Sequence, residues 1–164
     1  MNNYDFIAPI YDTISRIVYG NALRDAQAFY LNEIPQGSRV LIIGGGTGWV
    51  LTQIKDPSLD IDYVEKSERM LGLAKKRETG ARVSFINKSK VDCVNEYDVI
   101  ITPFILDCIP HPSLDIFVGD LYHSLKNKGF WILTDFDEES KSFLNTLLTY
   151  LMFAFFRVTT QIPV

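Results

Sequence analysis

Apolar runs typical of buried strands alternate with helical patterns along most of the chain. Continuous hydrophobic stretches of this kind are expected where both faces of a parallel sheet are covered. They occupy residues 39–43, 61–65, 82–86, 97–104 and 129–136. Helices are predicted from the glycines after residue 43 to Lys55, over 67–78, and from a cap at Ser113 to about Leu125. This order predicts an α/β fold, a Rossmann-like three-layer sandwich with a mostly parallel central sheet.

Both ends of the chain have helical patterns. Residues 1–34 carry apolar side chains three and four positions apart and predict a helical cap, which Pro9 divides into two short helices. Residues 140–158 predict an apolar helix that is too short and too interrupted to span a membrane. The apolar pattern of this segment favours a helix packed on the core. The alternatives are a helix that lines a pocket for an apolar ligand and one that contacts a membrane surface. We expect a single domain over residues 1–164, with the α/β core at 38–136.

Composition narrows the class of protein. The chain has 164 residues, of which 47% are hydrophobic and 22% charged, enough for one substantial core. A net charge of −4 gives no basic surface for nucleic acid. The N-terminus lacks the pattern of a secretory signal, and Cys93 and Cys108 form no zinc motif. We therefore expect buried thiols, no metal and a cytoplasmic location.

The most informative motif is VLIIGGGTGWVL at residues 40–51, a buried strand followed by a glycine-rich turn and a helix. Gly44 permits a tight turn, Gly46 leaves room for a ligand at the backbone, and Gly48 lets the next helix pack closely. Such a turn presents backbone N–H groups to a polar ligand. Trp49 stands where the third glycine of a dinucleotide fingerprint would be, which disfavours a nicotinamide-dependent reductase. A P-loop is excluded because no Gly-Lys-Ser/Thr follows.

This turn and the segment YVEKSERM at 63–70 resemble the class I S-adenosylmethionine-dependent methyltransferases. The GxGxG spacing is similar to their first motif. Glu65 ends the second predicted strand, 21 residues after Gly44, where the family has an acidic residue that binds the ribose hydroxyls. The opening YDFIAPIYDTISRIVYG is similar to the N-terminal helices that cover the cofactor in quinone-type and related small-molecule methyltransferases. YDVIITPFILDCI and LKNKGFWILTDF resemble later motifs of the family.

The resemblance implies S-adenosylmethionine as the cofactor and assigns contacts to it. A carboxylate such as Glu65 can accept hydrogen bonds from two vicinal hydroxyls, although a solvated turn residue is the alternative. Tyr11 is the candidate contact from the N-terminal cap. The alternative is that it is an ordinary tyrosine on an amphipathic helix, with no role in binding. The full set of implied contacts is Tyr11, Gly44, Gly45, Gly46, Thr47, Gly48, Glu65, Lys66, Met70, Lys88, Ser89 and Thr102.

The chain departs from the family pattern in three places. Ile42 stands where an acidic residue is usual, and Lys88 or Ser89 stands where an acid often reads the adenine amino group. The sixth and seventh strands of the usual seven are lacking. The sheet would then have an open edge, which proteins normally cover, and a homodimer is one way to cover it.

Methyl transfer is an in-line displacement, so the protein mainly positions two reactants and excludes water. A general base is needed only if the acceptor arrives protonated. Asp107 and His111 follow the fourth strand and are the candidate catalytic residues; a turn cap and an exposed loop histidine are the alternatives. The apolar C-terminal segment favours a small, partly apolar acceptor. The competing interpretation is a catalytically degenerate or truncated cofactor-binding or interaction domain of the same fold.

Overall fold

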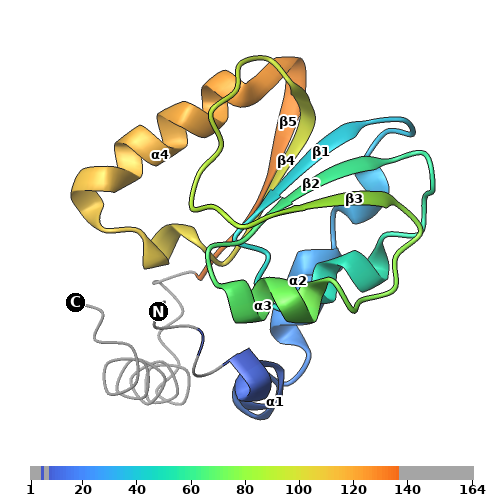
Figure 1. Ribbon diagram of the computed structural model, residues 1–164, viewed down its shortest axis with the longest axis vertical. Helices are drawn as coiled ribbons and strands as arrows, with labels where there is room; N and C mark the ends of the chain where they lie inside the picture. Colours follow the sequence, from blue (N-terminus) through green and yellow to red (C-terminus); the bar gives the residue numbers. More distant parts are fainter. Residues whose placement is uncertain (1–4, 6–7, 137–164) are drawn as a thin grey trace.

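A computed structural model describes Asp5 and residues 8–136 (Figure 1), so the predicted helix at 140–158 lies outside the described residues. The described chain contains one sheet of five parallel strands in the order β3-β2-β1-β4-β5. The strands are β1 (Arg39–Ile43), β2 (Asp60–Val64), β3 (Arg82–Ile86), β4 (Tyr97–Pro103) and β5 (Leu125–Thr134). The Rossmann-like α/β prediction is confirmed, and the sheet is entirely rather than mostly parallel.

The strands are continuous apolar runs because the central ones are covered on both faces. Residues 40–43 of β1 are at most 1% exposed. Val40 and Ile42 pack into one apolar cluster with side chains of α3 (Glu68–Ala74) and the 3-10 helix η3 (Trp49–Gln53). Leu41 and Ile43 pack on the other face against α4 (His111–Ser124) and the loop 87–96. Figure 1 shows α4 on one side of the sheet and α3 on the other.

Within the described residues the predicted helices are present, but their first and last residues differ from the prediction. The cap contains α1 (Ala8–Tyr19), α2 (Ala22–Ala28) and η2 (Leu31–Glu33). Most of the residues before Pro9 lie outside the described residues, so the prediction that Pro9 separates two helices stays a prediction. Pro9 lies in the first turn of α1, where a missing N–H breaks no helical hydrogen bond. After α1 the chain turns at Gly20, whose φ of +60° suits glycine.

Two further helix predictions need correction. The helix expected up to Lys55 is the short η3, in which the Thr52 hydroxyl donates to the Trp49 carbonyl (2.7 Å) and competes with α-helical hydrogen bonding. α4 begins at His111 rather than at a Ser113 cap, because Pro110 ends the preceding turn. The helix predicted over 67–78 is α3, which ends at Ala74, four residues before the predicted end.

The thiols are less buried than expected. Cys93 is half-buried beside the α4 face of the sheet, and Cys108 is exposed, so the prediction of a buried thiol is wrong for Cys108. Cys108 belongs to the 3-10 helix η4 (Leu106–Cys108), which follows β4 and was not visible in the apolar pattern. No helix among residues 8–136 has the length and apolar character that a bilayer crossing requires.

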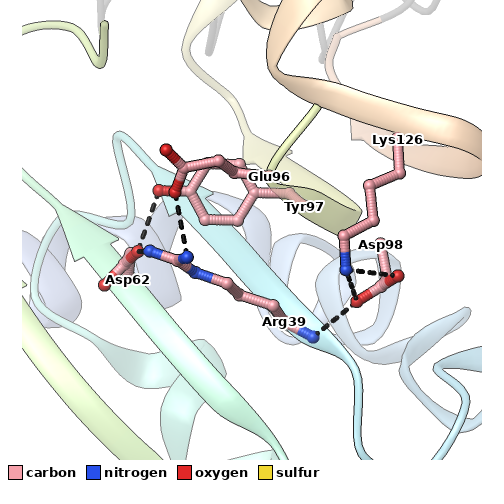
Figure 2. Close-up of polar contacts among 6 residues, drawn as sticks. All are labelled: Arg39, Asp62, Glu96, Tyr97, Asp98 and Lys126. Carbon is pink, nitrogen blue, oxygen red and sulfur yellow. Dashed lines mark hydrogen bonds and ion pairs between the residues drawn. The ribbon is translucent and has the colours of Figure 1, made fainter. Parts of the chain in front are cut away.

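A polar network joins the amino ends of the strands (Figure 2). Arg39 binds Asp62 on β2 (3.0 Å), and the Tyr97 hydroxyl on β4 donates to the same carboxylate (2.8 Å). The backbone N–H of Arg39 donates to Asp98 (2.9 Å), which also binds Lys126 of β5 (2.9 Å). The network therefore ties β1, β2, β4 and β5 together at the end of the sheet opposite the glycine turn.

We expect Asp98→Asn to lower the free energy of unfolding by roughly 0.5–1 kcal/mol at pH 7. Burial alone would raise the pKa of Asp98, but hydrogen bonds from Arg39 and Lys126 outweigh it and lower that pKa. A carboxyl group with a lowered pKa stabilises the fold above its unfolded-state pKa, and the stabilisation is lost as the pH falls through the folded-state pKa. Urea unfolding at several pH values should show the variant's deficit shrinking in acid. Exposed Asp92→Asn is the control, and a deficit independent of pH would contradict the assignment.

Candidate functional site

The carboxyl ends of β1, β2 and β4 bring the glycine turn, Glu65 and η4 to one rim of the sheet. Gly44 donates its N–H to the Val64 carbonyl (2.9 Å), which holds the turn against the end of β2. Ligands of open parallel sheets bind at this rim, beyond the carboxyl ends of the strands. The sequence-derived candidates therefore gather on the side where the fold can form a site.

The glycine turn is closely packed everywhere except at Gly46. Gly44, Gly46 and Gly48 have φ of +72°, +61° and +78°, a region that other residues rarely adopt. A Cβ atom would lie 2.2 Å from Ile105 at Gly44 and 2.4 Å from Tyr63 at Gly45. At Gly46 its nearest neighbour would be the Met70 sulfur at 3.8 Å. The backbone at Gly46 is thus open to a close approach.

Gly48 has a different neighbour from the one expected. A Cβ atom there would lie 2.7 Å from the Ala74 Cα, so Gly48 packs against the end of α3 rather than against the helix that follows it in sequence. Thr47, beside it, is buried. The turn is consequently clamped between β2 and α3.

Glu65 faces the open part of the turn. Its side chain is 8% exposed; Oε2 accepts the Gly46 N–H (3.0 Å) and Oε1 accepts the Ser67 N–H (2.7 Å). Burial raises the pKa of this carboxyl group, although the backbone donors oppose the shift. A carboxylate has about four lone-pair sites, so each oxygen keeps the capacity to accept a further hydrogen bond from a ligand.

Two side chains that the sequence analysis missed support this arrangement. The Tyr63 hydroxyl donates to the Gly46 carbonyl (3.1 Å) from within the core. The Asn87 amide donates to the carbonyls of Glu65 (2.9 Å) and Lys66 (3.0 Å). Asn87 is the first polar residue after β3, which is the signal that could have found it.

The N-terminal segment is fastened to the rim at two points. Ser67 donates its hydroxyl to Asp5 (2.6 Å), and Arg69 donates to the Asp5 carbonyl (3.2 Å). Farther along, the Thr47 hydroxyl donates to Asp12 of α1 (2.6 Å). Arg77 pairs with Asp12 and also donates to the Thr47 carbonyl (3.0 Å). We call these two sets of contacts, at Asp5 and at Asp12, latches. Neither latch was predictable from the sequence, because each joins polar residues that are far apart in the chain.

The remaining sequence candidates lie in three kinds of surroundings. Thr102 is fully buried and accepts a hydrogen bond from the Trp131 indole (2.8 Å). Met70 is buried beside Gly46, and Tyr11 packs against it from α1. The residues with exposed side chains are Lys66, Lys88, Ser89, His111 and Asp107. Over residues 8–136 and Asp5, no cluster of histidine, cysteine and acidic side chains could hold a metal ion.

The latch between α1 and the glycine turn yields a prediction about coupling. Asp12→Ala, Arg77→Ala and the double variant form a cycle whose interaction free energy should be about 1 kcal/mol, since the pair is about one-third exposed. Urea unfolding of the four proteins measures it. An additive double variant would mean that the ion pair does not hold α1 against the turn.

Sequence comparison finds no counterpart for this chain: no family model matches it, and no curated protein does. Solved structures do match. A Methanococcus maripaludis protein grouped with the S-adenosyl-L-methionine-dependent methyltransferases superposes with a TM-score of 0.64 at 15% identity, over 94% of this chain and 73% of that one. Burkholderia thailandensis 1,6-didemethyltoxoflavin-N1-methyltransferase, solved with 1,6-didemethyltoxoflavin and S-adenosylhomocysteine, gives 0.59 at 16% identity, over 79% and 58%.

A TehB-like S-adenosylmethionine-dependent methyltransferase from Corynebacterium glutamicum gives a TM-score of 0.54 at 14% identity, over 65% of this chain and 59% of that one. The present chain thus spans between 58% and 73% of the length of these three proteins. At such low identity the likeness establishes architecture. The chain has the Rossmann-like fold of the class I S-adenosylmethionine-dependent methyltransferases.

Proposed function

We propose that the protein is an S-adenosylmethionine-dependent methyltransferase that acts on a small, partly apolar molecule. The observation that carries the proposal is the open backbone at Gly46 next to the buried Glu65 carboxylate, in a turn that is otherwise closely packed. A neutral sugar edge with two hydroxyls suits this pair of groups. The structural neighbour from Burkholderia thailandensis holds S-adenosylhomocysteine, which supports the same cofactor here.

The residues present fit this cofactor. Glu65 would accept hydrogen bonds from the ribose hydroxyls, while the turn at Gly44–Gly48 would offer backbone N–H groups to the amino-acid end. Met70 and Tyr11 would supply apolar contact, and Lys66, Lys88 and Ser89 lie on the loops where an adenine ring would reach backbone groups. Buried Thr102 would act by holding the end of β4. When bound, the cofactor supplies a methyl group activated by a positively charged sulfur.

The chain itself would contribute positioning and proton transfer. The latches at Asp5 and Asp12 hold the N-terminal segment over the rim, where it would help to exclude water. Asp107 lies at the carboxyl end of β4 and is our candidate for accepting a proton from the acceptor. His111, the exposed first residue of α4, is the second candidate base.

A second candidate function is a degenerate domain that binds the cofactor without transferring its methyl group. Ile42, where the related enzymes usually have an acid, is fully buried in the core, so that position offers no charge to the ligand. Tight cofactor binding without turnover of any acceptor would favour this alternative.

S-adenosylhomocysteine should raise the melting temperature of the protein, and NADH should not. At about 100 times its dissociation constant a ligand stabilises by roughly 2.7 kcal/mol, or about 5–10 °C for a domain of this size. Gly46→Ala should remove most of the shift, because its methyl group fills the open approach. Gly37→Ala is the matched control, since Gly37 also has a positive φ (+74°) with no atoms within 4 Å of its Cβ position but lies at the other end of β1. A shift with NADH alone would overturn the proposal.

We also propose that two copies of the chain associate along β5. Among the described strands β5 pairs only with β4, and its outer edge has no strand beside it. Lys126 and Lys128 in its first half disfavour strand addition, so pairing would use Phe130–Thr134. We place this dimer in the cytoplasm, which the two cysteines would allow because they form no disulfide among the described residues.

Sedimentation equilibrium should therefore detect a dimer. A substitution at Ile132 would not test the dimer, because this side chain is buried and its loss would disturb the core. Leu133→Lys, on a side chain that is 53% exposed, should shift the protein to monomer without lowering its melting temperature. A wild-type protein that stays monomeric at high concentration would contradict the dimer and leave the cofactor assignment untouched.

A further inference from the structure

An open pocket lies between α1 and α2, beside the glycine turn. Its volume is about 350 Å³, and its lining residues are Asp12, Thr13, Arg16 and Ile17 of α1 and Arg24 of α2. Pockets for small molecules begin at about 300 Å³, so this one has room for an anionic group with a small body attached. It is separate from the open backbone at Gly46, and the proposed cofactor does not account for it.

The pocket is positively charged. Arg16 and Arg24 line it, and neither forms an ion pair with a described residue. Among the described lining residues Asp12 is the only acid, and both of its oxygens are engaged. Oδ1 accepts the Thr47 hydroxyl (2.6 Å), and Oδ2 pairs with Arg77. Two arginine charges therefore remain without a counter-ion, although the whole chain has a net charge of −4.

An aromatic ring positions one of these charges. The guanidinium carbon of Arg24 lies 5.4 Å from the centre of the Trp49 ring, in a cation–π contact, and Arg24 is half-buried. Trp49 is the residue that stands where a dinucleotide fingerprint would have its third glycine. A guanidinium that stacks on a ring keeps the N–H groups at its edge free to donate. Because Arg24 is already held, binding a ligand costs it little conformational freedom.

The lining of α1 combines three kinds of side chain on one face. Thr13, Arg16 and Ile17 are three and four residues apart, which places them next to each other on the helix surface. They offer a hydroxyl donor, a positive charge and an apolar surface. Ile17 is 78% exposed, the highest value for a large apolar side chain among the described residues. An apolar ligand body at the mouth of the pocket would cover it.

We propose that this pocket binds the phosphate group of a small molecule, between Arg16 and Arg24, with an apolar body against Ile17. Each planar guanidinium can donate two parallel hydrogen bonds to phosphate oxygens. A phosphate monoester carries close to two negative charges at pH 7, which matches the two arginines, whereas a carboxylate neutralises only one. S-adenosylmethionine contains no phosphate, so this ligand is a second one and the site does not depend on the proposed function.

The position of the pocket gives the ligand a structural effect. A phosphate between Arg16 and Arg24 ties α1 to α2, and α1 is fastened to the glycine turn where Thr47 donates to Asp12. Occupation of the pocket thus fixes the N-terminal cap over the rim of the sheet. The protein should melt at a higher temperature when the phosphate ligand is bound.

Titration calorimetry in a low-salt, phosphate-free buffer tests the site, on the full chain without S-adenosylhomocysteine. The probes are phenyl phosphate, inorganic phosphate and benzoate. We expect phenyl phosphate to bind about tenfold more tightly than benzoate, which has one charge, and a few times more tightly than inorganic phosphate, which has no apolar body. Ile17→Ser should abolish the difference between the two phosphates. Equal binding of these two by the wild type would overturn the contact with Ile17 and assign the site to free phosphate.

Charge variants test the two arginines. Arg16→Gln and Arg24→Gln should each weaken the binding of phenyl phosphate about tenfold. Arg82→Gln is the matched control, because it removes the same charge from an exposed arginine at the start of β3, outside the pocket, and should change nothing. Trp49→Leu keeps both charges but removes the ring beneath Arg24, and should weaken binding by a smaller factor.

Three results would overturn the phosphate site. Benzoate could bind as tightly as phenyl phosphate, which would remove the match between two charges and two arginines. Arg82→Gln could weaken binding as much as Arg16→Gln, which would mean that only the net charge of the protein matters. Phenyl phosphate could also fail to bind the wild-type protein. Arg16 is exposed, so Arg16→Gln should keep the wild-type melting temperature, and its loss of binding then reports on the ligand.

Discussion

The conformation of the turn after β1 is the constraint on which the site depends. Three glycines with positive φ bring the backbone so close to Ile105, Tyr63 and Ala74 that side chains have no room at positions 44, 45 and 48. The closeness fixes where the N–H of Gly46 points, and the buried carboxylate of Glu65 accepts it. A polar group is therefore already held in the apolar core before any ligand arrives. Binding can then proceed without reorganising the rim, which preserves affinity.

The elements differ in how readily the sequence reveals them. The central strands were predictable to within a residue or two because both faces are buried, so that neighbouring residues such as Val40 and Leu41 must both be apolar. Helix extent was harder, because local chemistry at Pro110 and Thr52 overrides periodicity. The glycine turn and Glu65 have a characteristic spacing. Asp12 and Arg77 have no such spacing, because tertiary folding alone brings them together.

The rim combines contributions from nearly every part of the described chain. Asp5 and Asp12 reach it from the N-terminal cap, Glu65 from β2, and Asp107 and Asp135 from the segments after β4 and β5. Most side chains of the apolar clusters lie between the sheet and the helices, and Tyr63 and Ala74 are the members that reach the glycine turn. Changes at the rim can therefore alter chemistry while the core keeps its packing, which suits a fold that serves many substrates.

The strand order also has a consequence for synthesis. β1 lies at the centre of the sheet, between β2 and β4, yet β4 follows it by more than fifty residues. A nascent chain that has emerged only as far as β3 leaves one edge of β1 unpaired, and four of the five residues of this strand are apolar. Unpaired apolar edges promote aggregation, so the interval before β4 leaves the ribosome is the one in which the growing chain is most exposed to it.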